Sequence, residues 1–216
     1  MVDLADAAVV AILTRAPSRG GKSRLFGELS MAPDPALLTA LLLDTLDGAS
    51  VAGVTRVVAV EPPDACQEVR ALLSDDVIVV AQGAGTLGDR MRSLMTEILA
   101  RGARRVVLVG SDIPDIDSVA VAHALALLEA NPDAIVLGPA SDGGYYLIGA
   151  AKSVPPVFDS VNWGSTDVMS ETLRIARKYD RQVAIVSTGS DVDTVADLRQ
   201  VRSARTREWV RAHLED

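Results

Sequence analysis

Short apolar runs alternate with longer amphipathic stretches along the chain. The apolar runs are rich in Val and Ile and show no apolar–polar alternation, a pattern typical of parallel strands covered on both faces. They predict strands at residues 7–13, 54–60, 77–80, 105–109, 134–137 and 182–186. The stretches between them predict helices at residues 34–49, 63–73, 88–101, 117–130, 166–179 and 203–214. This alternation predicts an α/β fold, a three-layer α/β/α sandwich with a mostly parallel central sheet.

One segment departs from the parallel pattern. Residues 145–149 follow the fifth predicted strand after only a short loop, which predicts one antiparallel strand. No fixed-period repeat and no Pro/Gly/Ser-rich linker divides the chain. We therefore expect residues 1–216 to form a single domain.

The composition narrows the class of protein. Of the 216 residues, 49% are hydrophobic and 23% are charged, which is typical of a folded soluble domain. The formal net charge of −8 and the aromatic content of 3% argue against nucleic acid and anionic membranes as partners. The first apolar run is too short to span a membrane and follows no basic segment. A single cysteine, Cys66, excludes an internal disulfide, and we expect a cytoplasmic protein.

The loop after the first predicted strand is a candidate phosphate site, because open α/β sheets bind ligands beyond the carboxyl ends of their strands. Residues 14–24 carry four cations, two glycines and no acid. The loop is not a Walker A motif, since Ala16 stands where the first glycine would be. Cationic side chains and backbone N–H groups near paired glycines can hold an anion, while the alternative is a solvated basic loop. The candidate nucleotide-binding residues here are Arg15, Gly20, Gly21, Lys22 and Arg24.

The loop after the third predicted strand has the glycine pattern of a dinucleotide-binding turn. Residues 83–88 match G-x-G-x-x-G, and Asp112 follows 24 residues after Gly88. This is the third strand rather than the first, and Asp112 lies in an abrupt Gly-Ser-Asp-Ile-Pro turn, which argues against a nicotinamide or flavin site. Two interpretations stay open, a structural turn and a nucleoside contact. The candidate nucleoside-binding residues are Gln82, Gly85 and Thr86.

Three aspartates follow predicted strands. Asp112 comes at the end of a central strand with no Lys or Arg nearby in sequence, and a carboxylate there is costly unless it binds a cation. Asp191 and Asp193 follow the last strand at i, i+2 spacing, which points both side chains the same way in extended backbone. Such carboxylates suit Mg²⁺ (or Mn²⁺). The alternative is turn and helix-cap chemistry, with Asp193 as the N-cap of a helix over residues 194–200.

The loop after the fifth predicted strand is a candidate acceptor site. Its Ser-Asp-Gly-Gly-Tyr-Tyr sequence suggests close approach of the backbone to a ligand, although a tight turn is an equally good interpretation. Trp163 would form a wall of the pocket, or would pack as an ordinary core residue. The candidate acceptor-binding residues are Asp142, Gly143, Gly144, Tyr145 and Trp163.

Four motifs, in this order along the chain, resemble one family. They are Arg15-Ala16-Pro17 with Gly20-Gly21-Lys22-Ser23-Arg24-Leu25, Leu87-Gly88-Asp89-Arg90-Met91, Gly110-Ser111-Asp112-Ile113-Pro114, and Asp142-Gly143-Gly144-Tyr145-Tyr146-Leu147-Ile148-Gly149. Over about residues 7–200 the chain resembles the glycosyltransferase-like branch of the nucleotide-diphospho-sugar transferase (GT-A) superfamily. More distantly it is similar to phospholactate/phosphoenolpyruvate guanylyltransferase and molybdenum-cofactor guanylyltransferase. With the former it shares a Lys-x-Arg-Leu loop and an Asp-x-Asp-Thr-x-x-Asp-Leu segment at residues 191–198.

The resemblance implies a GT-A fold that binds a nucleotide and a divalent cation. It implies that Lys22 and Arg24 contact phosphates. It also implies that Asp112, Asp191 and Asp193 are the metal ligands. The chain departs from the family in having Arg15 where Lys is common and Ser23 where Thr is common. The loop at residues 142–146 also differs from the guanylyltransferase loop, so the resemblance leaves the acceptor open.

These features predict a magnesium-dependent nucleotidyltransferase. It would move a nucleotidyl group from a nucleoside triphosphate, with GTP suggested by the resemblance, to a small phosphorylated or hydroxyl acceptor and release pyrophosphate. Lys22, Arg24 and Asp112 would be its catalytic residues, acting by positioning and charge neutralisation. The alternatives are a glycosyltransferase that uses a nucleotide-sugar, and a nucleotide-binding accessory domain without turnover. The arginines of the C-terminal helices form a solvated face or the contact of a homodimer.

Overall fold

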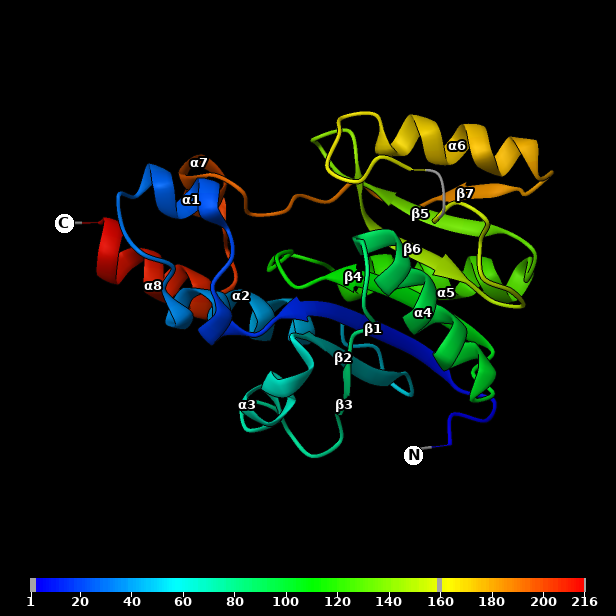
Figure 1. Cartoon of the computed structure of the whole chain (residues 1–216), viewed down its shortest axis with the longest axis horizontal. Coiled ribbons are helices and arrows are strands. Elements are labelled where there is room, and N and C mark those ends of the chain that lie inside the picture. Colours follow the sequence, from blue (N-terminus) through cyan, green and yellow to red (C-terminus); the bar gives the residue numbers. More distant parts are fainter. Residues whose placement is uncertain (1–2, 159–160, 216) are drawn as a thin grey trace.

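A seven-stranded sheet forms the centre of the fold, with the strand order β3-β2-β1-β4-β6-β5-β7 (Figure 1). The computed structural model describes residues 3–158 and 161–215. The strands are β1 (Ala8–Arg15), β2 (Thr55–Glu61), β3 (Ile78–Ala81), β4 (Arg105–Gly110), β5 (Ile135–Pro139), β6 (Tyr145–Ala150) and β7 (Val183–Ile185). β6 is antiparallel to both of its neighbours, and the other pairs are parallel. The predicted fold class and its antiparallel strand are confirmed.

The central strands bring two predicted site loops to the same edge. β1 lies between β2 and β4, and its residues from Val9 to Ile12 are fully buried, as their unbroken apolar sequence predicts. In the register of the sheet Leu13 lies beside Gly110. The loops that follow β1 and β4 therefore leave the sheet next to each other.

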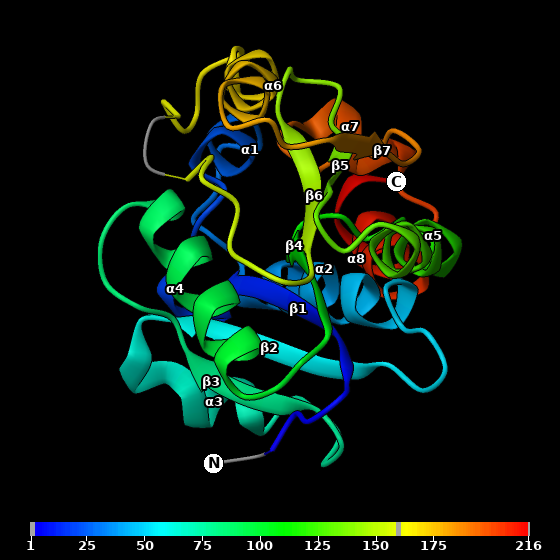
Figure 2. The same cartoon turned by 90° about the vertical axis from the view of Figure 1, so that its right-hand side faces the viewer.

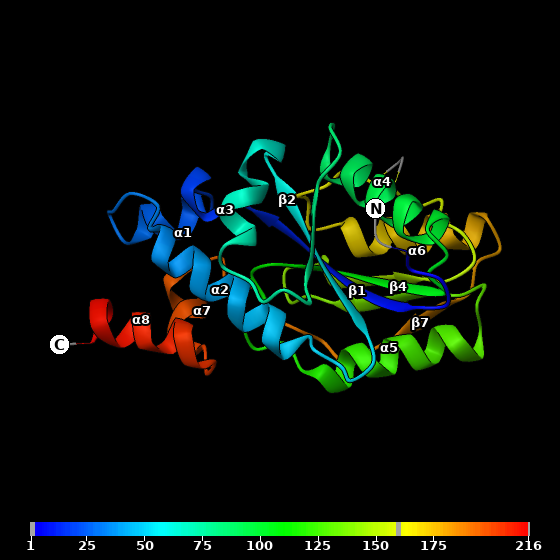
Figure 3. The same ribbon diagram turned by 90° about the horizontal axis from the view of Figure 1, so that it is seen from below.

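Helices cover both faces of the sheet. α2 and α5 pack on one face, while α4 and α6 pack on the other (Figure 2). α1, α7 and α8 gather with α2 at one end of the molecule, around a separate apolar cluster (Figure 3). The helices are α1 (Ser23–Glu28), α2 (Pro35–Gly48), α3 (Cys66–Arg70), α4 (Leu87–Ala100), α5 (Ser118–Ala130), α6 (Val168–Lys178), α7 (Val195–Gln200) and α8 (Ala204–Leu214), with 3₁₀ turns η1 (Pro17–Arg19) and η2 (Pro63–Ala65). Within the described residues, no helix combines the length and apolarity needed to cross a membrane.

Two helical segments differ from the prediction. The helix expected at residues 63–73 is shorter, because η2 precedes α3 and α3 ends at Arg70. α1 was not predicted, since it has only six residues and lies inside the basic loop. Its buried Leu25 and Phe26 belong to the cluster around α2, so tertiary packing rather than local propensity stabilises this helix.

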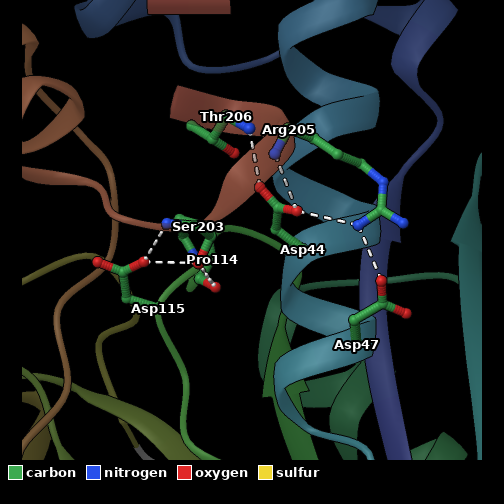
Figure 4. A network of polar contacts seen from close by, with 7 residues as sticks. All are labelled: Asp44, Asp47, Pro114, Asp115, Ser203, Arg205 and Thr206. Atoms are coloured by element: carbon green, nitrogen blue, oxygen red, sulfur yellow. Dashed lines mark hydrogen bonds and ion pairs between the residues drawn. The ribbon is translucent and has the colours of Figure 1, made fainter. Parts of the chain in front are cut away.

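The start of α8 is anchored by aspartates from two distant segments (Figure 4). Asp44 of α2 accepts a hydrogen bond from the Thr206 N–H at 2.8 Å. Asp115, in the loop after β4, accepts one from the Ser203 N–H at 2.9 Å. The first N–H groups of a helix have no hydrogen-bond acceptor within the helix, and these carboxylates act as their acceptors. The C-terminal helices are thereby fastened to α2 and to the loop that carries Asp112.

Candidate active site

The loop after β1 turns sharply at three consecutive residues. Gly20, Gly21 and Lys22 have φ angles of +68°, +136° and +49°. Glycine adopts such angles without steric cost, whereas a residue with a side chain rarely does. Lys22 is therefore held in an uncommon backbone conformation by its surroundings. α1 begins at the next residue. The turn places the Lys22 side chain at the edge where β1 and β4 end.

The Lys22 ammonium is bound by two carboxylates. Its Nζ pairs with Asp112 and lies 2.6 Å from Asp193 Oδ1. Burial by itself would lower the pKa of Lys22, but the charges and hydrogen bonds of Asp112 and Asp193 outweigh it and raise the pKa above its ordinary value. The side chain is 14% exposed, which limits screening by water. Lys22 is therefore a fixed positive charge at the carboxyl edge of the sheet.

Asp112, Asp191 and Asp193 come together beside Lys22. One carboxylate oxygen of each lies within 4.8 Å of the others. The Val192 N–H donates a hydrogen bond to the Asp112 carbonyl at 3.0 Å, which joins the loop after β4 to the segment after β7. Burial, together with the charges of Asp193 and Asp112, raises the pKa of Asp191 to about 6. A cluster of partly buried oxygen donors with excess negative charge fits a hard cation such as Mg²⁺ or Mn²⁺.

The helix-cap interpretation of Asp193 is wrong. The N-cap of α7 is Thr194, whose Oγ1 accepts a hydrogen bond from the Asp197 N–H, while the Asp197 carboxylate accepts one from the Thr194 N–H. This reciprocal pairing is a capping box. It leaves the Asp193 carboxylate to Lys22 and the acidic cluster.

A cavity of about 450 Å³ opens beside Lys22 and the acids, a size usual for small-molecule sites. Segments that follow the parallel strands β1, β4, β5 and β7 contribute to its lining, as do the antiparallel β6 and residues of the segment after it. The cavity therefore lies at the carboxyl edge, where open α/β sheets bind ligands. The predicted site residues that line it are Arg15, Gly20, Gly21, Lys22, Asp112, Asp142, Gly144, Tyr145, Trp163 and Asp191.

The glycine-rich loop before β6 forms a tight turn at the cavity. Asp142 Oδ1 accepts a hydrogen bond from the Gly144 N–H at 2.9 Å. Gly143 has a φ of +93°, and a Cβ built on it would collide with the Thr166 carbonyl oxygen. The turn interpretation is thus realised, and it also presents Asp142 and Gly144 to the cavity. Tyr145, which follows, contacts Trp163 edge to face with ring centroids 5.9 Å apart.

Six predicted site residues are not part of the cavity lining as far as the structure describes the chain. They are Arg24, Gln82, Gly85, Thr86, Gly143 and Asp193. Arg24 is 72% exposed and lies 3.6 Å from a carboxylate oxygen of Glu28, one turn along α1. Its predicted contact with phosphate stays a prediction.

Gln82 and Thr86 hold the end of β3 and the start of α4 in place. Gln82 is buried, and its Nε2 donates to the carbonyls of Thr14 and Ala59, each at 2.9 Å. Thr86 forms a capping box with Asp89 at the N-terminus of α4. These contacts are structural. A nucleoside contact by Gln82, Gly85 or Thr86 stays a prediction.

An apolar wall lines the cavity, and of its residues only Tyr145 and Trp163 are among those predicted from the sequence. We use this name for Leu87, Met91, Tyr145, Trp163 and Val168, all of which line the cavity. Leu87 and Met91 are one turn apart at the start of α4, and their spacing would have indicated a shared helix face. A Cβ on Gly88 would collide with Trp163 Nε1, so this glycine lets the indole pack closely on α4.

The fold and this edge of the sheet define a class, the nucleotidyltransferase-like branch of the nucleotide-diphospho-sugar transferase (GT-A) fold. Residues 45–165 match the model of the DUF2064 family, described as an uncharacterized protein conserved in bacteria. The chain belongs to this family. The resemblance predicted from the four motifs is confirmed.

Relatives of known type are transferases. The chain is 30% identical over 199 residues to a 3-phospho-D-glycerate guanylyltransferase of Phenylobacterium zucineum (strain HLK1), with 88% of each chain covered. It superimposes with a TM-score of 0.82 and 30% identity on a protein of Desulfovibrio desulfuricans G20 assigned to the nucleotide-diphospho-sugar transferases, covering 97% of this chain and 92% of that one. The 4-diphosphocytidyl-2C-methyl-D-erythritol synthase of Anaerococcus prevotii DSM 20548 shares the fold, with a TM-score of 0.55, 13% identity and coverage of 88% and 92%.

Proposed function

We propose that the chain is a nucleotidyltransferase that moves a nucleoside monophosphate from a nucleoside triphosphate to a small acceptor and releases pyrophosphate. The observation that carries this proposal is the convergence of Lys22 with Asp112, Asp191 and Asp193 beside the cavity. The guanylyltransferase relative supports GTP as the donor. Arg15, Gly20 and Gly21 line the same cavity as Lys22 and are proposed to contact the nucleotide.

The residues of the chain act by positioning and by neutralising charge. Mg²⁺ or Mn²⁺ held by Asp112, Asp191 and Asp193 would neutralise phosphate charge and align the reacting groups. Lys22, with its pKa raised, stays protonated and stabilises the negative charge that develops on the leaving pyrophosphate. An acceptor oxygen forms the new bond to the α-phosphorus. The bond from that phosphorus to the bridging oxygen breaks, and pyrophosphate leaves with the electron pair.

A second candidate is glycosyl transfer from a nucleotide-sugar. The structural similarity to the Desulfovibrio protein favours it. In that reaction the same cation and Lys22 would stabilise a nucleoside diphosphate as the leaving group. The basic loop favours the triphosphate, because a triphosphate carries more charge for its cations to neutralise.

The test is nucleotide stabilisation and turnover by the whole chain. We expect GTP with Mg²⁺ or Mn²⁺ to raise the melting temperature more than GTP alone, GDP-sugars or GDP, and pyrophosphate to appear when acceptor is added. Asp112→Asn should remove the metal-dependent part of the shift and keep the fold, as seen by circular dichroism. Stabilisation by a nucleotide-sugar alone would favour the second candidate. Metal-independent stabilisation by every nucleotide would contradict both.

Three further features stay predictions. They are the organisation of residues 1–216 as one domain, the cytoplasmic location and the homodimer. Size-exclusion chromatography with light scattering measures the oligomeric state. Limited proteolysis followed by mass spectrometry would reveal a second domain as a stable fragment.

A further inference from the structure

The charged residues that line the cavity offer too few positive charges to bind a second polyanion beside the triphosphate. Its lining contains two cations, Arg15 and Lys22, against three carboxylates, those of Asp112, Asp142 and Asp191. Both cations already have acidic partners. Arg15 Nε lies 2.9 Å from a carboxylate oxygen of Glu61, and Lys22 pairs with Asp112 and Asp193. Once a triphosphate and its divalent cation are bound, no lining cation of the described chain is left for an acceptor with several negative charges.

The side of the cavity beyond β4 is apolar. Tyr145 comes from β6, Trp163 from the segment after it and Val168 from the start of α6, and Leu87 and Met91 face them from α4. The indole of Trp163 is held in place by Tyr145, 5.9 Å away, and by Phe158, whose ring is stacked at 6.3 Å. Leu87 is 41% exposed although it is a large apolar residue, because it faces the open cavity. Covering such a surface with an apolar group lowers the free energy, because apolar area is removed from water.

Asp142 adds a negative charge near this wall. It lines the cavity in the turn that precedes Tyr145, and its Oδ1 is engaged by the Gly144 N–H. A phosphorylated carboxylic acid bound here would meet Asp142 on one side and the donor phosphates on the other. Like charges repel, although water screens part of the repulsion because Asp142 is exposed. A hydroxyl group would instead find in Asp142 a hydrogen-bond acceptor.

This inference rests on the proposed nucleotidyl transfer. We propose that the acceptor is an uncharged molecule that has a hydroxyl group and an apolar body the size of a single ring, rather than a phosphorylated acid. The apolar body packs on the wall between Leu87 and Trp163. The hydroxyl oxygen forms the bond to the α-phosphorus, and its proton passes to Asp142. The bond to the bridging oxygen breaks, and pyrophosphate leaves with the electron pair.

The experiment compares two kinds of acceptor on the whole chain with GTP and Mg²⁺. The probes are 2-phenylethanol and D-3-phosphoglycerate, and the readouts are pyrophosphate release and ligand-observed NMR binding in the presence of a non-hydrolysable GTP analogue. We expect saturable binding and turnover with the alcohol and at least tenfold less efficient use of the phosphoglycerate. Preferred turnover of the phosphoglycerate would overturn the inference and leave nucleotidyl transfer intact.

Two matched leucine variants locate the acceptor on the wall. Leu87→Ala should raise the KM or Kd of 2-phenylethanol about tenfold, the effect expected from removing the contact area of a leucine side chain, and leave the KM of GTP unchanged. Leu72→Ala is the control, because Leu72 is 38% exposed and is not part of the cavity lining. A rise in the KM of GTP alone would mean that the wall holds the base, and the inference would be wrong. If neither probe yields pyrophosphate and GTP gives no metal-dependent stabilisation, the proposed function fails and this inference fails with it.

Discussion

The Lys22 ammonium lies 2.6 Å from Asp193 Oδ1 and also pairs with Asp112, two of the three acids that would hold a divalent cation. Lys22 and the proposed metal ion would thus share these two carboxylates. A cation with two charges cannot approach these carboxylates closely while the ammonium stays between them, because the two positive charges repel. A triphosphate offers Lys22 another anionic partner, so binding of the nucleotide and of the metal should be coupled.

The first prediction concerns this competition. Lys22→Met should tighten the binding of Mn²⁺ in the absence of nucleotide by about tenfold or more, because the positive charge that pairs with Asp112 and Asp193 is removed. The same variant should bind GTP more weakly. Isothermal titration and Mn²⁺ electron paramagnetic resonance measure both affinities.

A matched control for this variant is Arg19→Met. Arg19 belongs to the same loop, but it pairs with the exposed Asp64 at 2.8 Å. It should leave Mn²⁺ binding unchanged. Weaker Mn²⁺ binding by Lys22→Met would show that the lysine supports the metal site instead of competing with the metal.

The second prediction is a pH dependence of stability. The pKa of Asp191 rises from 3.8 to about 6 on folding, so between these pH values the folded chain keeps a proton that the unfolded chain has lost. The contribution of Asp191 to the free energy of unfolding of the metal-free protein should therefore fall as pH rises through this window and stay low above it. Asp191→Asn should remove the fall and be more stable than the wild type at pH 7. Urea unfolding at pH 4.5 and pH 7 measures the difference, and equal pH profiles for the two proteins would contradict the assignment.

The same proton should compete with metal, which is the third prediction. Mn²⁺ affinity should increase as pH rises from 5 to 7, with a midpoint near the pKa of Asp191, about 6. Titration with Mn²⁺ at several pH values measures the midpoint. An affinity that is flat across this range would show that Asp191 is not a ligand.

The fourth prediction concerns the turn before β6. Gly143 and Gly164 both have positive φ, +93° and +89°, but only a Cβ on Gly143 would collide with a backbone oxygen, that of Thr166. Gly164→Ala should cost about 1 kcal/mol of unfolding free energy through backbone strain alone. Gly143→Ala should cost about 3 kcal/mol, since the turn must also move. Equal losses in chemical denaturation would mean that the turn yields freely.

The fifth prediction concerns the anchor of α8. Asp44 is 3% exposed and binds both the Thr206 N–H and the Arg205 guanidinium, whereas Asp47 is 57% exposed and pairs with Arg205 (Figure 4). Asp44→Ala should lower the free energy of unfolding by about 3 kcal/mol, because the buried Thr206 N–H loses its partner and Arg205 loses one of its two carboxylates. Asp47→Ala should lower it by less than about 1 kcal/mol. Thermal unfolding of the two variants tests the contrast, and a similar small loss for both would show that the helix docks through its apolar face alone.

The strands were predictable and much of the site was not, for a physical reason. The unbroken Val/Ile runs fix strands that are buried on both faces, and strand ends fix which loops share an edge. This is how Lys22, Asp112 and Asp191 could be selected before their contacts were known. The contact between Lys22 and Asp193 joins positions 171 residues apart, and no local pattern encodes such a pair. α1 forms only because Leu25 and Phe26 find a distant cluster.

The direction in which a side chain points was the second feature of the site that the sequence did not reveal. Gln82 follows a strand at the correct edge, yet it is buried and bound to two backbone carbonyls. Leu87, Met91 and Val168, the helical part of the apolar wall, were missed because nothing in an ordinary helix sequence shows that its residues line a cavity. Polar residues after strands are visible in a sequence, while the direction of each side chain depends on neighbours from elsewhere in the fold.

The hydrogen bond from the Val192 N–H to the Asp112 carbonyl has a consequence for protein synthesis. A chain emerging from the ribosome can pair β1, β4 and β6 and form the floor of the cavity before residues 191–193 exist. The proposed cation site would be completed only after β7 has added to β5 and the segment that follows it has reached Asp112. A nascent or prematurely terminated chain would therefore be unable to assemble the full set of carboxylates, and binding of the proposed cation would be restricted to finished molecules.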